Sequence, residues 1–174
     1  MPAQKISLPE AERLLAALVA QIRPQVGPRL ALVGIHTGGV WLAERLHQAL
    51  GLATPLGSID VSYYRDDFAR RGLRPGTKAS LLPFEVEGSD IVIVDDVLYT
   101  GRTIRAALNE LFDYGRPARV DLAVLVDRGE RELPIAARYC GHTLTQPLPA
   151  GQELVLARGS DDNLAFTLKE RNTA

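Results

Sequence analysis

The chain has 174 residues, a net formal charge of −1 and one cysteine, Cys140. This length fits a single domain with a sizeable hydrophobic core, and we expect one domain over residues 1–174. The charge excludes a protein-wide cationic field for nucleic acid, and the lone cysteine excludes an intrachain disulfide framework or a cysteine-cluster metal site. No apolar stretch approaches the roughly 18 residues that a membrane span needs, so we expect a cytoplasmic protein with no membrane segment.

Apolar periodicity predicts helices and strands that alternate along most of the chain. Helices are predicted after Pro9, over residues 40–50 and over residues 103–114. Strands are predicted over residues 30–35, 56–64, 91–94 and 120–126, with a terminal strand pair over 153–157 and 164–168. Residues 65–80 are rich in charge, glycine and proline, which predicts a flexible loop. Few regular signals appear between Arg128 and the terminal pair.

Buried strands that alternate with helices are typical of an α/β fold, with a mainly parallel sheet covered on both faces. Polar or glycine-rich segments follow the strands: HTGG after the first, YRDD after the second, DDVLYTGRT after the third and DRG after the fourth. Ligands of such sheets bind beyond the carboxyl ends of the strands. We therefore expect these four segments to meet at one edge and form a small-molecule site.

The segment DDVLYTGRT combines two acids with the start of a predicted helix. Asp95 and Asp96 follow a buried strand, and a buried carboxylate needs partners, such as the vicinal hydroxyls of a sugar or a bound cation. Behind them, a helix N-terminus with small residues is a ready anion site. A diol and a phosphate this close together describe ribose 5-phosphate. The alternative is that an acid caps a turn and Thr100 caps the helix.

The string IVIVDDVLYTGRT, residues 91–103, resembles the signature of type I phosphoribosyltransferases: an apolar strand, two acids and a T-G-x-T phosphate loop. Together with GRPARVDLAVLVDRGERELPI, GIHTGG and SIDVSYYRDD, it is similar to the pyrimidine operon attenuation regulator family, whose members are also uracil phosphoribosyltransferases. The resemblance covers about residues 30–141. It implies a type I phosphoribosyltransferase fold with a small hood and a flexible loop, in a homodimer or larger assembly.

The resemblance implies a role for each of these segments. Asp95 and Asp96 would hold the ribose hydroxyls of 5-phosphoribosyl 1-diphosphate, directly or through water on Mg²⁺. The 5-phosphate would lie against Leu98, Tyr99, Thr100, Gly101, Arg102 and Thr103. The diphosphate would bind Thr37, Gly38 and Gly39, and Arg65, Arg71 and Arg74 are candidate cations of the closing loop. Uracil would be read at Asp127, Arg128 and Gly129.

The implied reaction is displacement of diphosphate from C1 of the ribose by uracil, which gives uridine 5-monophosphate (UMP). One departure concerns the diphosphate turn, where Gly38 stands in place of an Arg that is common in relatives. This departure removes a cationic donor. His36 stands where relatives often carry Lys, so part of the donor capacity is retained.

The resembled family also binds a hairpin of pyr mRNA through a basic surface. Arg131 and Arg138 are candidate RNA contacts here, whereas Glu130 and Ala136 replace residues that are cationic in the family. Because Lys and Arg contacts to phosphates dominate such affinity, we expect weakened or lost RNA binding. Two alternatives stay open: a UMP- or phosphoribosyl-diphosphate-sensing mRNA attenuator with little catalytic activity, and a phosphoribosyltransferase for another base, such as a purine.

Overall fold

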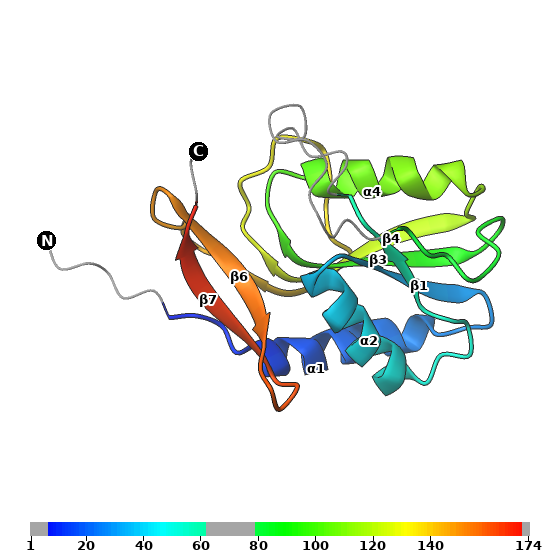
Figure 1. Cartoon of the computed structure of the whole chain (residues 1–174), viewed down its shortest axis with the longest axis horizontal. Coiled ribbons are helices and arrows are strands. Elements are labelled where there is room, and N and C mark those ends of the chain that lie inside the picture. The colour runs from blue at the N-terminus through cyan, green and yellow to red at the C-terminus, as the bar shows by residue number, and fades with distance from the viewer. Residues whose placement is uncertain (1–6, 62–78, 172–174) are drawn as a thin grey trace, which may run out of the picture.

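The computed structural model describes residues 7–61 and 79–171, and its centre is a five-stranded sheet (Figure 1). The sheet order is β2-β1-β3-β4-β5, and every neighbouring pair is parallel. The strands are β1 (Leu30–Ile35), β2 (Gly57–Ile59), β3 (Asp90–Leu98), β4 (Arg119–Asp127) and β5 (Tyr139–Thr143). The helices are α1 (Ala11–Ile22), the 3-10 turn η1 (Arg23–Gln25), α2 (Gly38–Leu50) and α4 (Arg102–Asp113).

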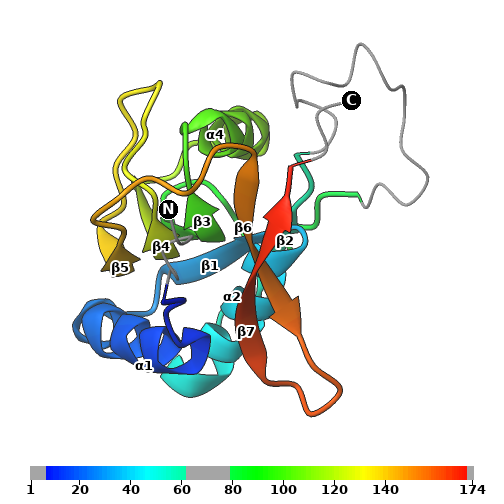
Figure 2. The ribbon, with the colours of Figure 1, turned by 90° about the vertical axis from the view of Figure 1, so that its left-hand side faces the viewer.

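Helices cover both faces of the sheet, with α1 and α2 on one side and α4 on the other (Figures 1 and 2). Neighbouring residues of one strand point to opposite faces, so each central strand supplies both cores. Val92 and Val94 of β3 pack with α1 and α2, whereas Ile91 and Ile93 pack with α4. Burial on both faces explains the continuous apolar runs in the sequence, and it confirms the predicted α/β class.

Several predicted boundaries need correction. The second strand was predicted over residues 56–64; β2 spans Gly57–Ile59, residues 60 and 61 are not in a strand, and residues 62–64 lie outside the described residues. Strand β5 was not predicted at all, because the short sequence YCGHT at the sheet edge has no apolar run. Strand β3 continues to Leu98, because its parallel ladder with β4 extends that far. Asp95 and Asp96 therefore lie within the strand and not behind it.

The predicted terminal strand pair is confirmed as an antiparallel hairpin of β6 (Gln152–Arg158) and β7 (Leu164–Glu170). Figure 2 shows the hairpin beside the sheet, next to α2. Its apolar face is buried in the core that α1 and α2 share; the buried residues are Leu154, Leu156, Leu164 and Phe166. The small hood that the family resemblance implied stays a prediction, and this hairpin is the candidate for it. No helix in the described part of the chain is long and apolar enough to cross a membrane.

One carboxylate ties the hairpin to the helices. Glu12 of α1 accepts hydrogen bonds from the amide of Leu164 at 2.8 Å and from the Arg45 guanidinium at 2.8 and 3.1 Å. The hydrogen bond from Arg45 lowers the pKa of Glu12, against the opposing effect of burial. A lowered pKa in the folded state means that the stabilisation is complete above the ordinary carboxyl pKa and is lost as the pH falls through the folded-state value.

We therefore expect Glu12→Gln to lower the free energy of unfolding at neutral pH, by about 1 kcal/mol, since solvent screens this partly exposed pair. The difference between variant and wild type should shrink in acid, because Glu12 is then protonated in both the folded and the unfolded wild type. Urea unfolding at neutral pH and at a series of lower pH values, extending well below the ordinary carboxyl pKa, measures both values. A difference that stays constant across this range would contradict the assignment.

Candidate functional site

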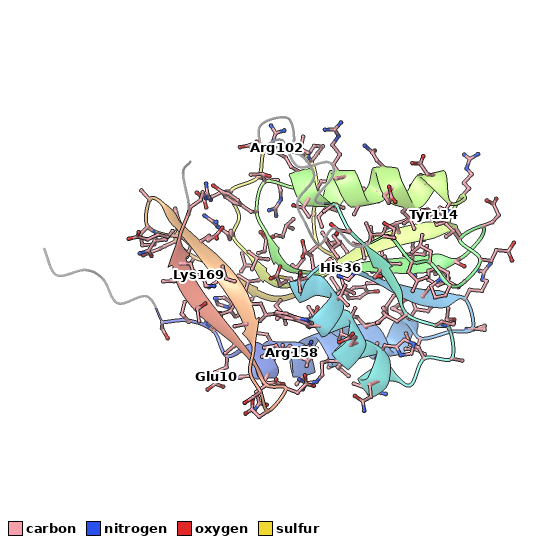
Figure 3. All side chains as sticks on the ribbon, viewed as in Figure 1. Glu10, His36, Arg102, Tyr114, Arg158 and Lys169 are labelled. Carbon is pink, nitrogen blue, oxygen red and sulfur yellow. The ribbon has the colours of Figure 1, made fainter. Side chains whose placement is uncertain are left out.

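The C-terminal ends of the central strands and the N-terminal ends of α2 and α4 meet at one edge of the sheet. In Figure 1 this edge faces the β6–β7 hairpin. Figure 3 labels two residues of this region, His36 after β1 and Arg102 at the first position of α4. Two helix N-termini at one edge offer backbone amides and positive dipole ends to anionic ligands.

Asp95 and Asp96 form the centre of this edge. Asp95 is 8% exposed, and its Oδ1 accepts the amide of Asp96 at 2.9 Å. Asp96 is half-buried, and its Oδ1 accepts the amide of Val97 at 2.8 Å. The capping alternative is therefore partly right, because each acid bonds a local amide. The second oxygen of Asp96, Oδ2, faces Gly38, which places an acceptor beside the neighbouring turn.

The turn after β1 packs directly against the two acids. A methyl group built at Gly38 would lie 2.5 Å from Asp96 Oδ2, and one at Gly39 would meet the Val94 carbonyl oxygen and lie 3.1 Å from the Asp95 Cα. Helix α2 begins at Gly38, two residues earlier than predicted, so both glycines belong to its first turn. A side chain at position 38 would have to displace the Asp96 carboxylate. The Arg that the family resemblance implies at this position does not fit this arrangement as it stands.

The loop between β3 and α4 has the geometry of an anion site. Gly101 has a φ of 94°, a left-handed conformation that glycine adopts without steric cost, and α4 starts directly after it. Thr100 Oγ1 accepts the amide of Arg102 at 3.2 Å, but the residue at the N-cap of α4 is Gly101, so the predicted helix cap by Thr100 is wrong. The first amides of a helix have no carbonyl one turn earlier, so those of Thr103 and Ile104 remain for a ligand. Leu98 differs from the other residues that were predicted to contact the 5-phosphate. Its side chain is buried in the core, and its carbonyl accepts the amide of Arg128.

The segment after β4 is held by bonds within the protein. Asp127 accepts the amide of Gly129 at 2.8 Å and two bonds from Arg131 Nη2, at 2.9 and 2.7 Å. Arg128 stacks on the Tyr99 ring, 3.7 Å from its centroid, and donates to Glu130 at 3.0 Å. The Asp127 carboxylate is therefore engaged inside the protein. The stack of Arg128 on Tyr99 joins this segment to the loop after β3.

The two candidate RNA contacts have different surroundings. The guanidinium of Arg131 is directed inward, where it bonds Asp127 and the carbonyls of Tyr99 and Ile135. This internal role was missed in the sequence, which shows only a basic residue in a polar segment. Arg138 is 44% exposed and donates to Asp121 at 3.2 Å. Arg65, Arg71 and Arg74 lie outside the described residues.

Metal ligands are few in this site. Within residues 7–61 and 79–171, no group of three or more His, Cys, Asp and Glu side chains could hold a metal ion. Asp95 and Asp96 are two neighbouring acids at the edge, and Asp96 Oδ2 faces the glycine turn. Such a site suits Mg²⁺, which is commonly held by one or two carboxylates together with substrate phosphates.

Comparison with known proteins extends this picture. Residues 6–144 match the phosphoribosyl transferase domain family. A relative from Pseudomonas paraeruginosa, named bifunctional protein PyrR, is 54% identical over 144 residues, which span 80% of this chain and 85% of that protein. A Pseudomonas fluorescens protein of the same name is 51% identical over 144 residues, with 80% and 86% covered.

Solved structures have the same fold. A hypoxanthine phosphoribosyltransferase from Staphylococcus aureus aligns with a TM-score of 0.63 at 22% identity, over 85% of this chain and 80% of that one. A purine phosphoribosyltransferase from Pyrococcus horikoshii aligns with a TM-score of 0.60 at 26% identity, over 79% and 84%. These likenesses confirm the predicted type I phosphoribosyltransferase fold. By the family match and the identity to its relatives, the chain belongs to the phosphoribosyltransferase family, in the branch whose members are named bifunctional protein PyrR.

Proposed function

We propose that this protein transfers the phosphoribosyl group of 5-phosphoribosyl 1-diphosphate to uracil and releases diphosphate. The observation that carries the proposal is the packing of the glycine turn on the acid pair, with Gly38 facing Asp96 Oδ2. This packing puts the acid pair between two helix N-termini, one at α2 and one at α4, and a diol would suit the acids. A ribose that carries a phosphate at C5 and a diphosphate at C1 fits this arrangement. Its hydroxyls would meet the acid pair, its 5-phosphate the start of α4 and its diphosphate the start of α2.

In this arrangement the protein acts chiefly by orientation. Asp95 and Asp96 accept the ribose hydroxyls, the amides at the start of α4 hold the 5-phosphate, and those at the start of α2 hold the diphosphate. The N1–C1 bond forms as the C1–O bond to diphosphate breaks, and the N1 proton is lost to solvent. Positive charge develops on the ribose, which lies beside the two acids. Negative charge develops on the leaving diphosphate, which lies at the N-terminus of α2.

The acid pair also supports Mg²⁺ as the cofactor. Asp96, and Asp95 beside it, would hold the ion through water, with the remaining ligands from the substrate. Bound there, Mg²⁺ would neutralise charge on the diphosphate and so improve it as a leaving group.

Uracil as the acceptor is supported by the membership in the PyrR branch, whereas the purine enzymes among the solved structures support the fold. Labelled uracil with 5-phosphoribosyl 1-diphosphate and Mg²⁺ should give labelled UMP. Guanine and hypoxanthine in tenfold excess should leave this yield nearly unchanged. Competition by either purine would favour a purine phosphoribosyltransferase, and nucleotide binding without any turnover would favour a sensor.

We further propose that regulation through pyr mRNA is weakened in this protein. Arg131 uses its donors internally, Glu130 pairs with Arg128 at 3.0 Å, and Ala136 carries no charge. A transcribed pyr leader RNA should therefore shift only weakly in a gel, with or without UMP. A strong shift that UMP strengthens would contradict this proposal.

A cytoplasmic location and a homodimer or larger assembly remain predictions. Size-exclusion chromatography with light scattering tests the predicted assembly.

A further inference from the structure

Residues 131–135, called the brace below, lie against residues 99–101 of the loop after β3. Arg131 contacts the loop, the brace and the end of β4 through one guanidinium. Its Nη1 donates to the Tyr99 carbonyl at 2.6 Å and its Nε to the Ile135 carbonyl at 2.7 Å. Its Nη2 donates to both carboxylate oxygens of Asp127, at 2.9 and 2.7 Å. One side chain thereby joins the loop, the brace and the end of β4.

The rest of the brace adds backbone and side-chain contacts to the same loop. The Thr100 carbonyl accepts the amides of Glu132 at 3.0 Å and Leu133 at 3.1 Å. Arg102 Nε donates to Glu132 at 2.8 Å. A methyl group built at Gly101 would lie 3.1 Å from the Ile135 side chain, so the loop packs closely on the brace.

These bonds determine the direction of the peptide groups in the loop. The C=O and N–H of a trans peptide unit point in opposite directions. The carbonyls of Tyr99 and Thr100 are bonded to the brace. The amides of the same peptide units belong to Thr100 and Gly101, and they point away from the brace. Amides aimed in one direction beside a helix N-terminus form a concave anion site.

We infer that Arg131 is a positioning residue. It holds the Tyr99 carbonyl and anchors the brace whose amides hold the Thr100 carbonyl, so that the amides of Thr100 and Gly101 point at the 5-phosphate. The inference rests on the proposed function and describes how its phosphate site is built. Arginine suits the task because its planar fork presents five donors in fixed directions. A lysine ammonium keeps the charge, but a compact head group does not span Tyr99, Ile135 and Asp127 together. The side chains of Arg131 and Asp127 are 20% and 17% exposed, so water screens their pair only partly.

The test compares Arg131→Lys with a matched control, Arg45→Lys. Arg45 also donates hydrogen bonds from both terminal nitrogens to a carboxylate, in this case that of Glu12. It donates a further hydrogen bond to the backbone carbonyl of Asp162 at 3.2 Å. Its contacts lie between the helices and the hairpin, and none involves the phosphate loop. The two variants therefore remove the same kind of bonding at two places in the fold.

Isothermal titration calorimetry with ribose 5-phosphate measures the phosphate site without any turnover. We expect Arg131→Lys to weaken this binding about tenfold, as loss of one to two net hydrogen bonds would do, and Arg45→Lys to change it less than about twofold. The KM for 5-phosphoribosyl 1-diphosphate should rise in parallel, with a smaller change in the KM for uracil. Equal affinities for wild type and Arg131→Lys, or equal losses in both variants, would overturn the inference.

The outcomes separate this inference from the proposed function. Wild-type protein that binds ribose 5-phosphate but does not convert uracil would defeat the proposed function, and the binding comparison would still decide the role of Arg131. No binding of ribose 5-phosphate by the wild type would overturn both. If Arg131→Lys does not fold, Asp127→Asn takes its place, because it removes the charge that Arg131 holds and keeps an acceptor oxygen. It should weaken binding in the same direction, and unchanged binding would overturn the inference.

Discussion

Replacing the two neighbouring acids of β3 by their amides, Asp95→Asn with Asp96→Asn, is expected to lower kcat/KM for phosphoribosyl transfer by ~1,000-fold or more. The asparagines keep an oxygen that can accept the local amides of Asp96 and Val97, so the fold should persist. They remove both negative charges from the place where we put the ribose hydroxyls and Mg²⁺. Steady-state kinetics of UMP formation, with circular dichroism as the check on folding, measure the effect.

The control for this pair is Asp90→Asn. Asp90 lies on the same strand as the two acids, at its opposite end, where β3 begins. Its amide variant makes the same chemical change away from the site and should retain wild-type kinetics within about twofold. If the double variant also retained activity, the assignment of the ribose hydroxyls to Asp95 and Asp96 would be wrong.

The second large effect is expected for Gly39→Ala. The added methyl group would meet the Val94 carbonyl oxygen and lie 3.3 Å from Asp95 Oδ1. Both neighbours belong to the central strand, so the turn must move away from the acids. A displacement of about 1 Å at a reacting centre can cost about 100-fold in rate, and we expect a loss of that size in kcat/KM.

Two other glycines give this experiment a graded control. Gly38→Ala meets the Asp96 carboxylate, which is the movable end of a side chain, so its loss should be smaller than that of Gly39→Ala. Gly27→Ala meets nothing within 4 Å and should leave the kinetics unchanged. Equal activity in all three variants would show that the close packing of the turn on the acids does not matter for transfer.

Much of the fold was predictable because the buried strands carry continuous apolar runs. The strands around residues 30–35, 91–94 and 120–126 were found within a few residues of their observed bounds, and so was the terminal hairpin. Strand β5 was missed because an edge strand with two half-buried and two exposed residues has no such run. Its pairing with β4 is a tertiary interaction that local periodicity does not encode.

The candidate site, too, was predictable only in part from the sequence. Asp95, Asp96 and the residues after them could be recognised in the sequence. Two acids next to an apolar strand, followed directly by the start of a helix, are an unusual combination that points to a ligand. The contact between Gly38 and Asp96 joins the first turn of α2 to β3, so the sequence shows the glycine but not the neighbour that requires it. The role of Arg131 was hidden for a related reason. A basic residue in a polar loop suggests a surface contact, and only its bonds to Tyr99 and Asp127 reveal the internal one.

The central claim is transfer of a phosphoribosyl group to uracil at the acid pair, and release of diphosphate measures it most directly. Diphosphate should appear from 5-phosphoribosyl 1-diphosphate only when uracil and Mg²⁺ are both present, in amounts equal to the UMP formed. Chelation of Mg²⁺ should stop the release, and added Mg²⁺ should restore it. Diphosphate release that does not depend on uracil, or no release with all components present, would contradict the account.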